Sequence, residues 1–154
     1  MFKNYGYDPL PTYKEPELQP SQKYPLTLIC AKVLQFCHGQ HRSLPSLRKV
    51  VPYPFLEINT TKAREMGIQQ GDWLMLESPS GSMKVKARLT TKIAPDVVCT
   101  QHGWWQSCPE LNLPGFDPYS PEGANVNLLY SNEPADPLSG SLLYKGYPCN
   151  FRKP

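Results

Sequence analysis

The chain has 154 residues, a length that encloses one hydrophobic core and so favours a single domain. Its 18 prolines, about 12% of the residues against a usual level of about 5%, show no period, which excludes a collagen-like chain and disfavours long helices. The formal net charge of +3 is mild and the basic residues form no block, so we expect no nucleic-acid partner. No apolar run approaches the ~20 residues of a bilayer crossing, so we expect no membrane insertion.

The cysteines favour free thiols over a cross-linked or metal-binding framework. Their number, five, is odd, and no two of them have the spacing CxxC. This pattern disfavours a complete set of disulfides as well as a zinc or iron–sulfur site. We therefore expect buried or partly buried free thiols at Cys30, Cys37, Cys99, Cys108 and Cys149.

Residues 1–24 predict an extended linker. Prolines at positions 9, 11, 16 and 20 exclude a regular helix there, and the polar residues between them leave no apolar face. A chain that opens in this way is typical of the tail of a longer protein. We expect a missing upstream domain, this linker, and then one folded domain over residues 25–154.

Short runs typical of strands dominate the first half of that domain. An apolar run at residues 25–30 predicts the first strand, and a loop-rich stretch separates it from a second strand at 54–58. Asn59 is expected to cap a short helix over residues 60–66, because its side-chain oxygen can accept an amide of the first turn. Gly67 then supplies the left-handed residue that ends the helix.

The second half predicts a hairpin followed by further strands. A turn at residues 78–81 joins a strand at 73–77 to a returning strand at 83–89, whose strict alternation sets its apolar residues apart from its basic ones. The basic face is expected to be merely solvated; it consists of Lys84, Lys86 and Arg88. Strands are also predicted at residues 97–100, 126–130 and 142–149.

Several sequence blocks occur together in an order that points to one family. The central block EINTTKAREMGIQQGDWLMLESPSGSMKVKARLT joins a strand, a short helix, a glycine turn and a hairpin, as the core of a double-psi β-barrel does. It is preceded by LTLICAKVLQFCHGQHRSLPSLR and followed by QHGWW, ANVNLL and DPLSGSLLYKGYPC. Over residues 24–151 these blocks resemble the C-terminal domain of the dimethyl sulfoxide reductase family of molybdenum and tungsten oxidoreductases. The resemblance implies a mainly β fold, a double-psi β-barrel with one short helix and long loops, that binds molybdopterin guanine dinucleotide.

The resemblance also implies which residues contact this cofactor. A pyranopterin with its pyrophosphate requires amide and side-chain donors and a cation. In the loop after the first strand the implied contacts are Lys32, Leu34, Phe36, His38, Gly39 and Gln40. Outside that loop they are His102, Trp104, Asn127, Tyr144 and Lys145. Lys32 is the expected cation, and Asn127 lies in an apolar run where an amide needs a polar partner. Many members of the family have serine in place of Gly39, which leaves that position its backbone amides only.

What the resemblance implies beyond the cofactor concerns a larger enzyme. In the family the molybdenum or tungsten is held by the pterin dithiolenes and often by a residue of an earlier domain, and an iron–sulfur cluster lies near the N-terminus. We therefore expect the remaining domains of a parent enzyme as partners, of the formate dehydrogenase or thiosulfate/polysulfide reductase kind, and no catalysis by this chain alone.

Two other interpretations stay open on the residues. One is a double-psi barrel adaptor that binds protein or peptide partners, for which a loop with histidine, glycine and glutamine facing Asn127 would be superfluous. The other is an independent small subunit of such an enzyme, which the linker-like opening disfavours.

Overall fold

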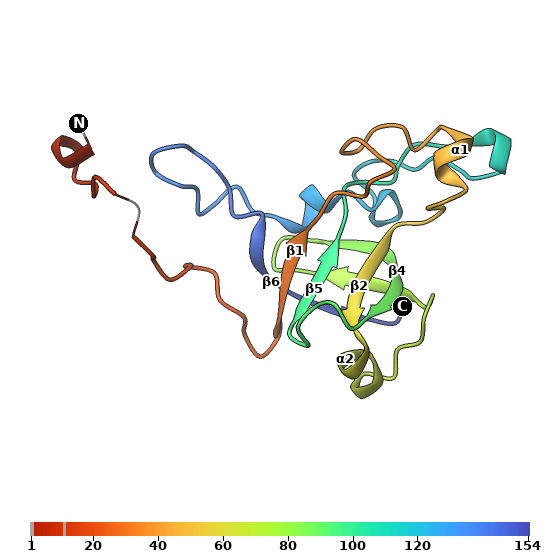
Figure 1. The fold of residues 1–154 in the computed structure, drawn as a ribbon, viewed down its shortest axis with the longest axis horizontal. Helices are drawn as coiled ribbons and strands as arrows, with labels where there is room; N and C mark the ends of the chain where they lie inside the picture. The colour runs from red at the N-terminus through yellow and green to blue at the C-terminus, as the bar shows by residue number, and fades with distance from the viewer. Residues whose placement is uncertain (1, 11) are drawn as a thin grey trace.

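The computed structural model describes residues 2–10 and 12–154, whose core is a closed barrel of six strands (Figure 1). The strands are β1 (Leu26–Cys30), β2 (Phe55–Asn59), β3 (Trp73–Glu77), β4 (Ser82–Thr90), β5 (Val97–Thr100) and β6 (Lys145–Arg152). The helices are α1 (Pro45–Arg48) and α2 (Thr60–Glu65), with 3-10 turns η1 (Phe2–Tyr5), η2 (Pro109–Leu111), η3 (Pro121–Gly123) and η4 (Val126–Leu129). The mainly β fold is confirmed. Positions 1 and 11 of the expected linker lie outside the described residues.

Strand pairing follows the connectivity of a double-psi barrel, in the order β1-β5-β2-β4-β3-β6 around the closed sheet. Two of the neighbouring pairs run parallel, β1 with β5 and β2 with β4. The antiparallel pair of β2 and β5 links them, and β6 closes the barrel by pairing antiparallel with both β1 and β3. Each parallel pair joins strands that are not consecutive along the chain, so a crossover connects the strands of each pair.

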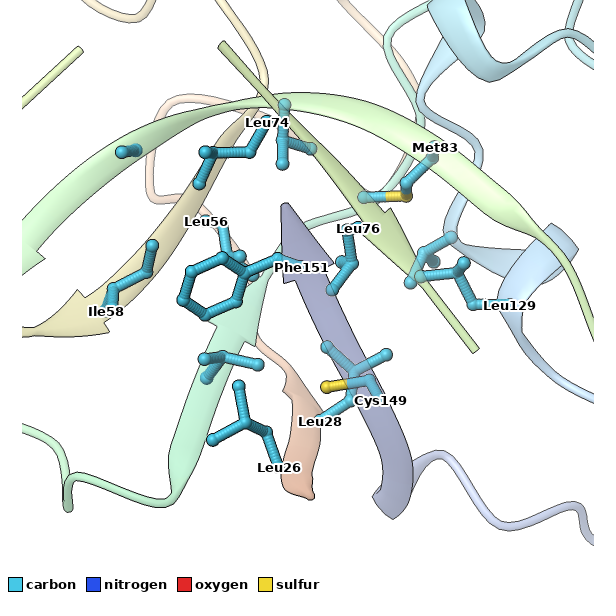
Figure 2. Close-up of a cluster of buried hydrophobic side chains, with 14 of the residues drawn as sticks. Leu26, Leu28, Leu56, Ile58, Leu74, Leu76, Met83, Leu129, Cys149 and Phe151 are labelled. Carbon is cyan, nitrogen blue, oxygen red and sulfur yellow. The ribbon is translucent and has the colours of Figure 1, made fainter. Parts of the chain in front are cut away.

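The barrel interior is filled by the apolar halves of alternating strands. In β4, Met83, Val85 and Ala87 are buried, as the alternation predicts. Figure 2 shows side chains such as Ile58, Leu76 and Phe151 converging from different strands into one cluster. Burying an aliphatic or aromatic side chain of this size stabilises a fold by about 1.5–3 kcal/mol, so this cluster holds the strands together.

α2 forms as the residues around it predict. The Asn59 side chain accepts a hydrogen bond from the Thr61 amide at 2.8 Å and donates to the Ile93 carbonyl at 2.7 Å. Gly67 adopts a φ of 64°, and the Ile68 amide returns to the Ala63 carbonyl at 2.8 Å. The helix lies at the end of the barrel opposite α1 (Figure 1).

The strand expected at residues 126–130 is wrong, because this segment forms the 3-10 turn η4 instead. The Asn125 side chain caps it by accepting from the Asn127 amide at 3.2 Å. Residues three apart share one face of a 3-10 turn, so Val126 and Leu129 are buried while Asn127 is exposed. The expectation that Asn127 is enclosed among apolar residues is therefore wrong as well. The last strand begins at Lys145, three residues later than predicted.

The basic side chains of β4 do more than face solvent. Lys86 Nζ lies 3.9 Å from the ring centroid of Tyr53, and the Arg88 guanidinium lies 4.2 Å from that of Phe55. Their stems and charges thus cover aromatic rings on the outer surface of the barrel, an arrangement that stabilises partly exposed rings.

The cysteines are free thiols, as expected, but one is not buried. Cys99, Cys108 and Cys149 are buried and Cys30 is half-buried, whereas Cys37 is exposed. Cys37 lies in the loop after β1, where no strand alternation directs its side chain inward.

Replacing a fully buried barrel residue should destabilise the chain far more than replacing an exposed one. We expect Leu76→Ala to lower the free energy of unfolding by about 2–5 kcal/mol, because it leaves a cavity in the cluster of Figure 2. Leu34→Ala, at a side chain that is 100% exposed, should change it by less than ~0.5 kcal/mol. Urea unfolding measures both, and equal losses would contradict this placement of the core.

Candidate functional site

Three strand ends meet at one end of the barrel. β1 and β5 run parallel with Cys30 opposite Thr100, so the chain leaves both strands on the same side. β6 runs antiparallel to β1, and its first residue, Lys145, pairs with Ile29. Lys32, His102 and Lys145 therefore come together although they are far apart in sequence.

A cavity of about 740 Å³ lies at this end of the barrel. It is lined by Cys30, Ala31, Lys32, His38, Gly39, His102, Gly103, Trp105, Asn125, Val126, Asn127, Tyr130, Tyr144 and Lys145. Its volume falls within the range of about 300–1,000 Å³ typical of small-molecule sites. Of the predicted contacts, the structure thus brings together Lys32, His38, Gly39, His102, Asn127, Tyr144 and Lys145.

The cavity wall favours an anion. Lys32 and Lys145 carry positive charge, and none of the described residues that line the cavity is acidic. Neither lysine takes part in the ion pairs formed within residues 2–10 and 12–154. Their charges are consequently available to a ligand such as a phosphate.

Two histidines and a thiol face one another at the cavity. The rings of His38 and His102 have centroids 5.2 Å apart, and His102 Nδ1 lies 3.9 Å from Cys30 Sγ. Burial lowers the pKa of His102, and electrostatic interaction with His38, Arg42 and Lys32 lowers it further. Burial raises the pKa of Cys30 to about 11, against the opposing effect of Lys145. At neutral pH this wall therefore presents a neutral imidazole and a protonated thiol.

Polar groups on η4, directly after it and directly before β6 also line the cavity. Asn127 is exposed on η4 and faces the cavity with an amide that can both donate and accept. The Tyr130 hydroxyl donates to the Tyr144 carbonyl at 3.1 Å, and the two rings meet edge to face with centroids 5.3 Å apart. Tyr130 thereby holds Tyr144 beside Lys145.

Two glycines allow Trp105 to form part of the wall. A Cβ at Gly103 would lie 1.6 Å from the Trp105 ring, and one at Gly39 would lie 3.0 Å from it. The first distance excludes any side chain, and the second leaves one very little room. Many members of the family have serine in place of Gly39. The glycine therefore lets the loop after β1 lie against the Trp105 ring.

Four predicted contacts lie outside the cavity. Leu34 is fully exposed and borders a separate shallow cavity beside Phe55 and Arg88. Gln40 is exposed, and its carbonyl accepts from Arg42 at 3.0 Å. The other two, Phe36 and Trp104, are buried together in a second apolar cluster, with ring centroids 5.3 Å apart.

Side-chain direction explains these differences and the residues that sequence reasoning missed. In the pair Trp104-Trp105 one ring is buried and the other lines the cavity, and the glycine before the pair was the available signal for a close ring. Asn125 and Tyr130 are not found from the sequence, because residues 126–130 predict a strand and not the turn that brings them to the cavity. Cys30 ends β1 and Ala31 follows it, at a place where only the barrel topology reveals a cavity.

The described residues contain neither a helix that could cross a bilayer nor a cluster of metal-binding side chains. None of the helices formed by residues 2–10 and 12–154 has the length and apolarity that a bilayer crossing demands. Within the same residues, no group of three or more histidine, cysteine, aspartate or glutamate side chains is placed to hold a metal ion.

Comparison with known proteins identifies the family. The family model described as the Molydopterin dinucleotide binding domain matches residues 26–148, which include the whole barrel except the end of β6. The chain belongs to this family. The resemblance to the dimethyl sulfoxide reductase family is thereby confirmed, since its relatives are molybdoenzymes of that family.

The relatives are much longer proteins. This domain is 34% identical over 150 residues to a dopamine dehydroxylase of Eggerthella lenta, covering 94% of this chain and 14% of that protein. It is 27% identical over 168 residues to an acetylene hydratase of Syntrophotalea acetylenica, covering 97% and 22%. The solved structure of the acetylene hydratase from Pelobacter acetylenicus superposes with a TM-score of 0.84 at 23% identity, over 99% of this chain and 22% of that one. The chain thus spans roughly a seventh to a fifth of the length of these relatives.

The lowered pKa of His102 predicts a pH-dependent stability. Below about pH 6.5 the unfolded state binds a proton at this residue that the folded state resists, so stability should fall as the pH drops from about 6.5 towards the lower folded-state pKa. We expect His102→Asn to reduce this fall and His41→Asn, at an exposed histidine, to leave it unchanged. Urea midpoints at pH 8.0 and 5.5 measure the effect. If the urea midpoint falls equally in the wild type and in His102→Asn, groups other than His102 cause the loss of stability.

Proposed function

We propose that the cavity at the end of β1, β5 and β6 binds the pterin and pyrophosphate of molybdopterin guanine dinucleotide. The observation that carries the proposal is the convergence of Lys32, His102, Asn127 and Lys145 on one acid-free cavity from four distant parts of the chain. These residues have no local reason to meet, so a shared ligand accounts for their arrangement better than secondary structure does.

The residues present fit this cofactor. Lys32 and Lys145 supply cations for the pyrophosphate, and the exposed amide of Asn127 offers a donor and an acceptor to the edge of a pterin. Trp105 offers a flat ring against which a second flat ring can stack. When bound, the cofactor supplies the metal and its redox chemistry, while this chain binds and orients the pterin.

We further propose that the domain works within a larger molybdenum or tungsten oxidoreductase as its C-terminal part, joined to the remaining domains by residues 1–24. Support comes from the much greater length of the relatives and from the redox names of two of them, a dopamine dehydroxylase and a periplasmic nitrate reductase. Acetylene hydratase carries a name of another reaction class. A parent of the formate dehydrogenase or thiosulfate/polysulfide reductase kind remains the specific expectation from the family resemblance.

Removing either cavity lysine should weaken binding of a ligand that carries both a pterin and a pyrophosphate. The probe is 6-hydroxymethylpterin pyrophosphate, titrated into the chain and followed by isothermal calorimetry. We expect Lys32→Met and Lys145→Met each to lose on the order of 1–3 kcal/mol of binding free energy, because each removes a charged partner of the phosphates.

The matched control is Lys92→Met, an exposed lysine that precedes β5 and so lies at the other end of that strand from the cavity. It should bind the probe as the wild type does. Equal losses of binding free energy in all three variants would mean that the probe responds to the net charge of the chain and not to the cavity lysines. Wild-type affinity in both cavity variants, or no binding by the wild type, would refute the proposed site and favour the adaptor interpretation.

A further inference from the structure

Arg42 is an almost completely buried cation next to the cavity. Only 1% of its surface is exposed, and its guanidinium carbon lies 4.0 Å from the ring centroid of Phe36 and 4.5 Å from that of Trp104. A second buried arginine, Arg48, is 2% exposed and lies 5.0 Å from the Trp104 centroid. The second apolar cluster therefore holds two guanidinium groups among aromatic rings.

The hydrogen bonds of Arg42 join two loops that line the cavity. Its guanidinium donates to the Gln40 carbonyl at 3.0 Å, directly after Gly39, and to the His102 carbonyl at 3.5 Å, directly before Gly103. Its backbone amide donates to Gln106 Oε1 at 2.9 Å. One side chain thus ties the loop after β1 to the loop after β5, some sixty residues further along.

Arg48 forms hydrogen bonds to the backbone around Arg42. Its guanidinium donates to the carbonyls of Arg42 at 3.0 Å, Pro52 at 3.0 Å and Gln106 at 3.2 Å. Backbone carbonyls satisfy this group, so Arg48 has a structural role that accounts for its burial. Arg42, in contrast, retains a buried Nε without a hydrogen-bond acceptor among the described residues.

Among the described residues, no carboxylate forms an ion pair with either arginine. The ion pairs formed within residues 2–10 and 12–154 involve neither Arg42 nor Arg48. Burial and the neighbouring Arg48 lower the pKa of Arg42 to about 10, which leaves it charged at pH 7. A buried cation without a counterion is costly, and its field in a medium of low dielectric extends to the adjoining cavity.

We propose that Arg42 is a positioning residue of the cavity, which holds its two loops together and gives its wall a positive charge that favours an anionic ligand. This inference rests on the proposed function for the nature of the ligand, a pyrophosphate. It adds a group that touches neither the cavity surface nor the ligand and acts through the loops that do. The charge and the fork of hydrogen bonds are separable contributions, because lysine retains the first and loses the second.

The pKa of His102 reports the charge of Arg42 without any ligand. The titratable groups around His102 are Lys32, His38, Arg42 and the thiol of Cys30. We expect Arg42→Met to raise the pKa of His102 towards its ordinary value and Arg42→Lys to keep it low, as measured by NMR titration of the histidine ring protons. The control Arg64→Met removes an exposed arginine of α2, beyond the opposite end of the barrel, and should leave this pKa unchanged.

Binding of inorganic pyrophosphate, followed by calorimetry at low ionic strength, reports the loops and the charge together. Arg42→Met should weaken it roughly tenfold or more, Arg42→Lys by a smaller factor, and Arg64→Met not at all. A folded Arg42→Met chain with wild-type His102 pKa and wild-type affinity would overturn the proposal. An equal rise of the His102 pKa in Arg42→Met and Arg42→Lys would overturn its electrostatic part, because lost packing would then explain both.

Two further outcomes distinguish failure of the Arg42 proposal from failure of the proposed function. If Arg42→Met does not fold, Arg42→Lys decides alone: weaker pyrophosphate binding with a low His102 pKa supports the proposal, and unchanged binding contradicts it. If the wild-type chain binds neither pyrophosphate nor the pterin probe, the proposed function fails, whereas the ligand-free His102 titration still tests the charge of Arg42.

Discussion

Parallel pairing between β1 and β5 is the constraint on which the cavity depends. Because Cys30 and Thr100 lie side by side with their chains running in the same direction, the two loops that follow leave the barrel together. The antiparallel partner β6 must then begin where those loops start, which brings Lys145 to the same place. This arrangement is costly to alter, since shifting one strand of the closed barrel would displace the hydrophobic contacts of Figure 2.

Long loops such as those after β1 and β5 are rarely rigid unless side chains pack beneath them. Here the second apolar cluster does so, with Phe36 from one loop against Trp104 from the other and Arg42 bonded to the backbone of both. Gly103 lets the Trp105 ring lie tightly over the same backbone. The cavity wall is therefore a packed structure of its own, supported by aromatic rings and guanidinium groups and attached to the barrel by three strand ends.

Relatives named for a dehydroxylation, a hydration and a nitrate reduction share this domain. Since these names cover different reaction classes, the fold of this domain does not by itself identify a reaction. The two lysines of the cavity favour an anionic group, and the Cys30 thiol, whose pKa burial raises to about 11, is protonated at neutral pH and therefore weakly nucleophilic.

The sequence by itself determined the strand and helix positions wherever one local rule applied: alternation in β4, the asparagine cap of α2, and the glycine that ends it. The order of its blocks also identified the family and half of the residues that line the cavity. Only the tertiary structure decided that residues 126–130 form a 3-10 turn with Asn127 outside, that Trp105 and not Trp104 faces the cavity, and that Phe36 is buried. Short apolar runs fit a strand and a tight turn equally well, and the direction of a loop side chain depends on neighbours distant in sequence. The buried pair Arg42 and Arg48 could not be foreseen for the same reason. Arginines are usually exposed, and the aromatic rings and carbonyls that hold these two inside come from the loops after β1 and β5 and from the segment after α1.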